Sequence, residues 1–383
     1  MELLCMEWKR IIKSWFFWVV MVLFIFSVHS QLAEEDFFSR PKPGEDSYGT
    51  MRTDDFEIIY QNAMFELLQS YQNNGYTTYP MAFYRHRKLN TEEQDIMSQI
   101  IMQLTGFSKD TIQQMAPQDI FQGGYILPEK EMLFALFYKV DALLGGGYFD
   151  KNTWMDKYGR IEKTYAMALE EYENILSRGF TKDFARIFCD YAGVFAGLLA
   201  GFMPVFLWYK DRKRRVTDII YVKNVSDVSL FCARTMAYLL AFIGVVFLFV
   251  TFYQWKAIHA FGWKAIDTYS LYWMALYWLL PTVFVITALS SLITIATDSP
   301  LAIPVIVLTW FLSVRGSLYK YGWKLIPRHN EFGNEVFFLE HYKQLILNRL
   351  LWTGVGIFLS LIAIYVLKQK REGKYVTKIK LHR

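Results

Sequence analysis

The sequence lacks the motifs that identify several large enzyme classes. It contains no G-x-x-x-x-G-K-[ST] stretch, so the chain has no phosphate-binding loop of the kind that serves ATP hydrolysis. It contains no H-E-x-x-H motif, and its six histidines are scattered along the chain, which disfavours a histidine-bound zinc site. We therefore expect no enzymatic activity in this chain and no cofactor or metal of its own.

Cysteine is scarce as well. The spacing of the three cysteines, Cys5, Cys189 and Cys232, excludes a cysteine-based zinc site. None of them lies between residues 31 and 186, so no disulfide can hold that region together. At about 150 residues, the region is long enough to fold around a hydrophobic core of its own.

Long apolar runs are what the chain has in excess. Its residues are 54% hydrophobic and 20% charged, whereas an ordinary soluble domain has about 45–50% apolar and about 25% charged residues. The excess is concentrated in six runs, and a helix needs ~20 apolar residues to cross a bilayer. The sequence therefore predicts an all-α integral membrane protein with six transmembrane helices. The runs cover residues 15–28, 187–209, 229–253, 269–296, 301–318 and 349–367.

These runs divide the chain into four parts: an N-terminal approach with the first span (1–30), a domain (31–186), five further spans (187–367) and a basic tail (368–383). The first run also fits a secretory signal peptide, with a cleavage site at Val28-His29-Ser30. We favour an uncleaved anchor, because Ile11 and Ile12 extend the run towards spanning length.

Charge is distributed unevenly and indicates an orientation. Residues 31–186 carry 16 Lys and Arg against 24 Asp and Glu, whereas the rest of the chain is strongly basic. The basic residues lie beside apolar runs, so membrane orientation explains them better than nucleic-acid binding, and we expect no nucleic-acid partner. Because Lys and Arg resist translocation, we expect a protein of the cytoplasmic membrane with both termini in the cytoplasm and residues 31–186 outside.

The outer region has the periodicity of helices rather than strands. Apolar residues recur at helical spacing in four stretches, and Thr91 with Gln94 matches a capping box. We therefore predict a largely α-helical extracytoplasmic domain. The predicted helices are Phe56–Tyr71, one that begins at Thr91, one between Pro128 and Gly145, and Arg160–Ser177, which Gly179 ends.

Three features of the predicted spans indicate how they pack, where one of them bends and which transport class they disfavour. Gly193, Gly197 and Gly201 recur every four residues, as small residues do where membrane helices pack closely, although glycine is also simply common in such helices. Pro281 interrupts the fourth span and predicts a kink. No span, as drawn from the apolar runs, has an acidic residue near mid-membrane, which argues against an ion-coupled transporter.

The stretch between the second and third runs has a pattern of its own. Residues 210–229 carry six basic and three acidic side chains. Val216, Ile219, Ile220 and Lys223 follow the i, i+3, i+4, i+7 spacing of one helix face. One interpretation is a positive loop that only sets topology; the other is a short helix that contacts a partner.

This stretch resembles the type 2 ABC-transporter permease family. The similar features are an acidic residue near the loop start (Asp211), a basic cluster, a short helix, a loop with Ser226, and Ala233-Arg234-Thr235 leading into a span. The order of one span, a large external domain and five more spans also matches the family plan.

The resemblance implies a function and a mechanism. The chain would be the permease subunit of an ATP-driven exporter, working as a homo- or heterodimer with a second permease subunit. A separate ATPase would dock on the loop at 210–229 and tilt the spans when it closes on ATP. The implied coupling residues are Asp211, Arg214, Arg215, Val216, Asp218, Ile219 and Ile220.

Two other functions remain open at this point. The chain can be a non-transporting membrane protein whose external domain binds a ligand or partner, with the spans as anchor or signal relay. A membrane enzyme ranks third, because no catalytic group is visible in the sequence.

Overall fold

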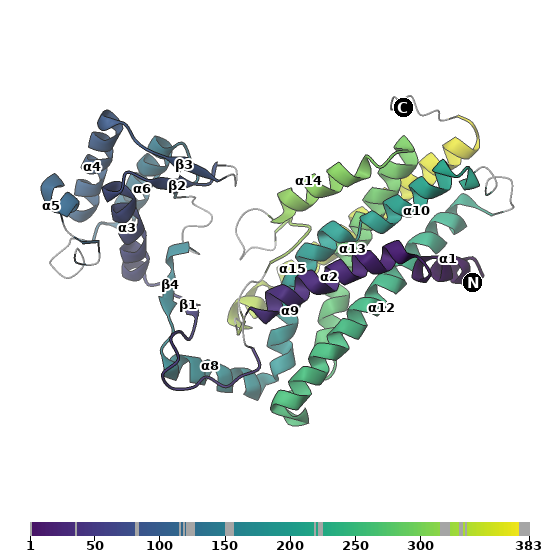
Figure 1. Ribbon diagram of the computed structural model, residues 1–383, viewed down its shortest axis with the longest axis horizontal. Helices are drawn as coiled ribbons and strands as arrows, with labels where there is room; N and C mark the ends of the chain where they lie inside the picture. Colours follow the sequence, from purple (N-terminus) through teal and green to yellow (C-terminus); the bar gives the residue numbers. More distant parts are fainter. Residues whose placement is uncertain are drawn as a thin grey trace. The chain divides into compact units, whose positions relative to one another are not determined.

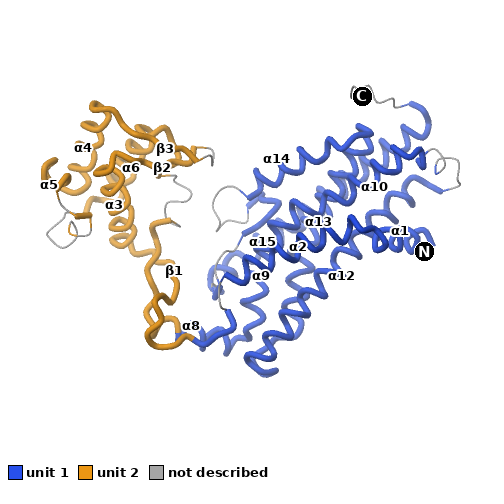
Figure 2. Tube along the Cα trace, in the orientation of Figure 1, with its two compact units in different colours: residues 1–40, 169–314, 318–383 blue, residues 41–168, 315–317 orange. Residues whose placement is uncertain are grey.

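The computed structural model describes residues 2–34, 37–80, 84–114, 116–117, 119, 127–149, 157–217, 220, 225–314, 322–328, 332–333 and 335–374. Within these ranges, helix dominates, and the strands are four segments of three residues each (Figure 1). The chain forms two compact units (Figure 2). Unit 1 consists of residues 1–40, 169–314 and 318–383, and unit 2 of residues 41–168 and 315–317.

Unit 1 is a bundle of apolar helices. Five helical stretches in the described chain are long and apolar enough to cross a membrane: 15–33, 180–213, 227–261, 263–297 and 335–371. The chain is therefore an all-α, multi-pass membrane protein, as its composition predicted. The helices are α1 (Glu2–Ile12), α2 (Trp15–Ala33), α9 (Phe180–Leu199), α10 (Phe202–Lys213), α12 (Asp227–Phe261), α13 (Ser270–Thr297), α14 (Ala302–Val314) and α15 (Glu335–Arg371), with the short η3 (Trp263–Ala265) before α13.

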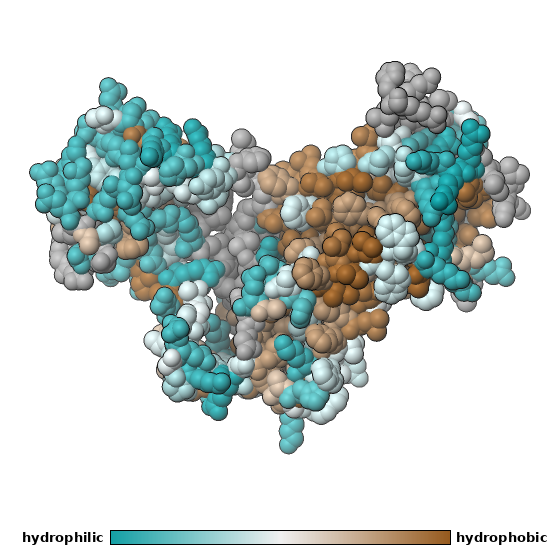
Figure 3. Space-filling model, viewed as in Figure 1, coloured by the Kyte–Doolittle hydropathy of each residue, from teal (hydrophilic) through white to brown (hydrophobic). Residues whose placement is uncertain are grey.

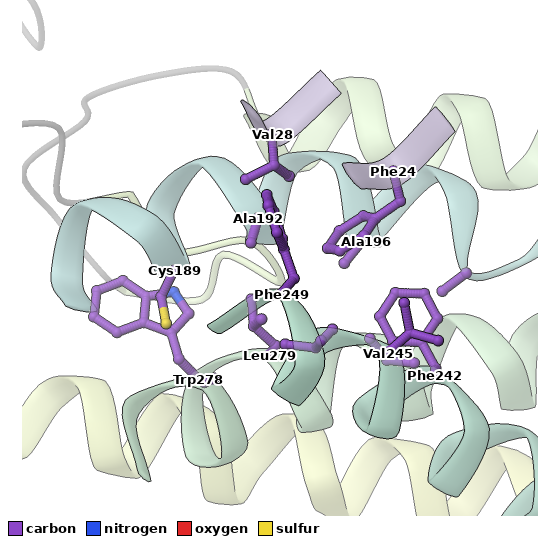
Figure 4. Packing of buried hydrophobic residues seen from close by; sticks show 14 of the residues in the cluster. Phe24, Val28, Cys189, Ala192, Ala196, Phe242, Val245, Phe249, Trp278 and Leu279 are labelled. Carbon is purple, nitrogen blue, oxygen red and sulfur yellow. The ribbon is translucent and has the colours of Figure 1, made fainter. Parts of the chain in front are cut away.

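The core of unit 1 lies where α2, α9, α12 and α13 meet. Phe24 of α2, Ala192 of α9, Phe249 of α12 and Trp278 of α13 are all buried there (Figure 4). The other side of these helices is also apolar, and hydrophobic residues dominate the visible face of unit 1 (Figure 3). Leu248 of α12 is 71% exposed, as expected of an apolar side chain that contacts lipid.

Two of the three regularly spaced glycines permit close packing, as predicted. A Cβ atom at Gly197 would overlap Ile326, and one at Gly201 would overlap Ile306 and Ser290. At Gly193 the surrounding atoms leave ordinary van der Waals space. The α9–α10 junction therefore approaches its neighbours more closely than any side chain would allow.

Unit 2 folds around its own core. The helices α3 (Phe56–Gln72), α4 (Thr91–Thr105) and α6 (Lys130–Leu144) each contribute buried residues to this core, and α5 (Lys109–Gln114) adds Ile112. Two antiparallel strand pairs complete the unit: β1 (Thr50–Arg52) with β4 (Arg160–Glu162), and β2 (Tyr76–Thr78) with β3 (Arg85–Arg87). The helix α8 (Tyr165–Arg178) follows β4 and continues into unit 1.

Two details of unit 2 differ from the sequence prediction. The capping box of α4 is made by Asn90 and Glu93, one residue earlier than Thr91 and Gln94. The predicted helix Arg160–Ser177 begins as strand β4, because Arg160–Glu162 pairs with a segment more than 100 residues away. Such pairing overrides local helical periodicity and cannot be read from a short window of sequence.

Candidate functional site at the basic end of the helix bundle

One end of unit 1 gathers the residues that the sequence singled out. We call it the basic end; it carries α1, the end of α10, the start of α12, the α13–α14 turn and the end of α15. Of the predicted coupling residues, Asp211, Arg214, Arg215, Val216 and Ile220 are described. Asp218 and Ile219 lie outside the described residues.

The exposed basic loop begins where α10 stops. The backbone of Arg215 has a φ of 57°, in the left-handed region, and its N–H donates to the carbonyl of Arg212 at 3.1 Å. Arg214 and Arg215 are exposed, as a polar rim requires. Val216 is half-buried and helical, and Ile220 packs against a buried cluster that includes Phe231. Ile220 therefore contacts the bundle with part of its side chain and remains half-exposed.

Asp211 is buried, not exposed. Its carboxylate accepts from Arg10 of α1 (Nη1 to Oδ2, 3.0 Å) and pairs with Arg234 of α12 (Nη2 to Oδ2, 2.8 Å). Arg234 also donates to Glu7 of α1 at 2.9 Å. We call these four residues the anchor network. It contains two carboxylates and two guanidinium groups, so its formal charge is zero.

Three of the four side chains in the anchor network are shielded from water. Glu7, Asp211 and Arg234 are each less than 9% exposed, and the Arg234 guanidinium lies 4.2 Å from the ring centroid of Trp208. Burial lowers the pKa of Arg10, but its hydrogen bond and attraction to Asp211 outweigh that effect and leave the pKa raised. Arg10 is therefore positively charged at physiological pH.

A second set of ion pairs lies next to the anchor network. Asp298, in the turn after α13, pairs with Arg212 of α10 at 3.4 Å and with Lys370 of α15 at 2.8 Å. Arg371 pairs with Asp227 at the start of α12, at 3.2 Å, and donates to the carbonyl of Val225. The end of α10 is thus joined through Asp211 and Arg212 to α1, α12, α13 and α15.

Sequence reasoning missed most of these partners. Glu7 and Arg10 lie on a helix that precedes the first span, and Asp298 and Lys370 lie 69 and 141 residues beyond the end of the loop at residue 229. A usable signal was present in Arg234, a charged residue placed inside the third apolar run. An intramembrane charge needs a partner, but the sequence does not name it.

The opposite end of unit 1 also holds buried charges. Because α9 begins at Phe180, the second span includes Asp183, which precedes the apolar run 187–209, as well as Asp190, which lies near the start of that run. Asp183 pairs with Arg178 at 3.0 Å and with Arg186. Asp190 accepts from Arg328 at 2.8 and 2.9 Å. The spans therefore do carry buried carboxylates, and each is neutralised by an arginine.

No cluster of three or more His, Cys, Asp or Glu suited to a metal occurs in the part of the chain that the structure describes. Comparisons with protein-family models, with curated proteins and with solved structures find no match to this chain.

Proposed function

We propose that the chain is the permease subunit of an ATP-driven exporter of the type 2 ABC class, coupled to a separate ATPase at its basic end. The observation that carries the proposal is the anchor network at the root of the exposed basic loop. A loop that only set topology would need positive charge, but it would not need a buried four-residue connection to two other helices.

The network gives the loop a means of moving the spans. Asp211 is the last buried residue of α10 before the exposed run 212–215. Breaking a buried ion pair costs about 3–5 kcal/mol, because an uncompensated charge remains. A displacement of the loop by a partner therefore carries α10, α1 and α12 together instead of bending the loop alone.

We further propose six crossings of the membrane, with both termini in the cytoplasm. The contacts Arg10–Asp211 and Asp298–Lys370 support this, because they bring α1 and the end of α15 to one end of unit 1. Because the first and last helices of the unit reach the same end of it, the number of membrane crossings between them is even. At 13 residues α14 is only ~20 Å long, so it needs adjoining residues to complete the remaining crossing. The positive-inside rule assigns the basic end to the cytoplasm and unit 2 to the outside.

The basic end of unit 1 also supplies the exposed residues that we propose contact the ATPase. Arg214 and Arg215 form an exposed basic rim for an ATPase, with Val216 beside them. Rim charges guide encounter, whereas buried apolar anchors carry affinity. We propose that Asp218 and Ile219 contribute to the same contact with the ATPase. We also propose that the chain forms a dimer with a second permease subunit. Asp211 has a positioning role, since its burial keeps it from touching a partner.

The test separates docking from coupling. The affinity-tagged chain is purified from the membranes of its own host, and a co-purifying ABC ATPase is identified by mass spectrometry and by vanadate-sensitive ATP hydrolysis. Val216→Asp with Arg215→Glu should release the ATPase and leave membrane abundance unchanged. Asp211→Asn should retain the ATPase but lose export. The control is Lys264→Gln, an exposed charge change at the other end of the unit.

A second candidate function is the binding of a ligand or partner by unit 2, which has its own core, enclosed by α3, α4 and α6. In that case the chain binds a ligand or partner through unit 2 and transports nothing. Wild-type chain that retains no ATPase, while unit 2 captures a defined partner, would favour this function over export.

A further inference from the structure

Arg349 of α15 is an unusual buried charge. Three arginines in the described chain are less than 9% exposed: Arg186, Arg234 and Arg349. Arg186 pairs with Asp183, and Arg234 pairs with two carboxylates of the anchor network. No described carboxylate lies within ion-pair distance of Arg349.

The hydrogen-bond partners of Arg349 are all neutral. Its Nη1 donates to the carbonyl of Trp278 at 3.0 Å and to the Thr282 hydroxyl at 2.8 Å. Its Nη2 donates to the carbonyl of Leu325 at 2.9 Å, and its Nε to the side-chain oxygen of Asn348 at 2.9 Å. Hydrogen bonds to dipoles orient the guanidinium, but they leave a full positive charge inside the membrane unit, which is costly.

The carbonyl of Leu325 belongs to a non-helical segment, 322–328, that enters the core of unit 1. Leu325 and Ile326 are buried, and Ile326 lies against the glycines of α9. Such backbone is tolerated at membrane depth only where protein surrounds it. Side chains of neighbouring helices hold its carbonyls: Asn348 donates to Gly322 (2.6 Å) and Lys324 (2.9 Å), Trp352 to Lys324 (3.0 Å), and Thr282 to Leu325 (2.9 Å).

The other described arginine at this segment has a counter-charge. Arg328 is matched by Asp190, to which it donates at 2.8 and 2.9 Å. Among the described arginines at this segment, Arg349 is therefore the one with no described carboxylate within ion-pair distance, and its guanidinium is buried.

We propose that Arg349 is the receptor for an anionic group, a carboxylate or phosphate, of the exported substrate, and that segment 322–328 covers this receptor when no anion is bound. The inference rests on the proposed export function and adds the substrate class to it. A carboxylate or phosphate adds the attraction of a full opposite charge, which the neutral carbonyls lack, and can accept two of the guanidinium hydrogen bonds side by side. An anion would therefore displace from the guanidinium the carbonyl of Leu325 and that of Lys324, which accepts from Nη2 of Arg349 at 3.4 Å.

The test uses the purified full chain in neutral detergent without an ATPase, so that its outcome is independent of export. Thermal unfolding is followed while decyl phosphate, 1-decanol or inorganic phosphate is added. We expect stabilisation by decyl phosphate and none by decanol. A comparable effect of inorganic phosphate would identify a free anion as sufficient, whereas its absence would identify an anion carried on an apolar chain.

Variants assign the effect to Arg349. Arg349→Gln should weaken the apparent affinity for decyl phosphate about tenfold to hundredfold, the range for losing a charged hydrogen bond. Arg349→Lys should keep the preference for the anion over decanol. Lys264→Gln, an equal charge change on an exposed side chain, should bind like wild type. Equal stabilisation by decanol and decyl phosphate, or unchanged affinity in Arg349→Gln, would overturn the proposal.

A second measurement covers the case in which Arg349→Gln fails to fold. In a background without Cys5, Cys189 and Cys232, an Ile326→Cys variant should react slowly with a maleimide, because the Ile326 side chain is fully buried. Decyl phosphate should speed this reaction severalfold by displacing segment 322–328. A rate that does not change with decyl phosphate would show that no anion displaces the segment.

Discussion

The anchor network leads to a quantitative prediction for Asp211→Asn. The substitution keeps the size and shape of the side chain but removes its negative charge. One carboxylate, Glu7, then faces two guanidinium groups, those of Arg10 and Arg234. Removing one partner of a buried ion pair typically costs about 3–5 kcal/mol. Arg10 is partly exposed, so solvent screens its share, and we expect a loss near 3 kcal/mol.

The assay is the free energy of unfolding of the purified chain in mixed micelles, titrated with a denaturing detergent. The matched control is Arg214→Gln, which changes one charge three residues away on an exposed side chain and should cost less than 0.5 kcal/mol. The double variant Asp211→Asn with Arg234→Met removes one charge of each sign. It should cost less than the sum of the two single variants, because the remaining pair, Glu7 with Arg10, is again balanced.

A small loss of unfolding free energy would contradict a buried, coupled anchor network. A loss below about 1 kcal/mol for Asp211→Asn would place the network in the range of exposed surface pairs, where solvent screens the charges. Strict additivity in the double variant would likewise show that Asp211 and Arg234 do not interact across the helices. In either case, the network would be too weak to transmit loop movement to α1 and α12.

Three further predictions concern packing, local stability and orientation. In α15, Gly356→Ala should cost about 1–3 kcal/mol of unfolding free energy because its Cβ would overlap a phenyl ring of α13, whereas Gly354→Ala, with open space around it, should cost nothing. Asn90→Ala should cost about 0.5–2 kcal/mol, read as faster amide exchange in the first turn of α4; unchanged exchange would contradict its capping role. On intact cells, with the native cysteines replaced, an impermeant thiol reagent should label Ser47→Cys but not Arg214→Cys, and the reverse pattern would invert the orientation.

The sequence by itself determined the class of this protein. Runs of apolar residues long enough to cross a bilayer leave few structures other than helices, because backbone groups in lipid must be satisfied internally. Helical periodicity also located α3, α4 and α6 to within a few residues, since apolar spacing and capping residues act over one or two turns. The sequence was sufficient to predict these helices because the contacts that form them join residues close together in the chain.

Tertiary structure decided what the charged residues do. Asp211 was selected from the sequence as a contact residue, yet it is buried among side chains from α1 and α12. The strand at Arg160 and the entry of segment 322–328 into the core likewise depend on partners far along the chain. A charge has the same local sequence signal whether it faces water or a distant counter-charge, and only the packing of the helices brings the counter-charge to it.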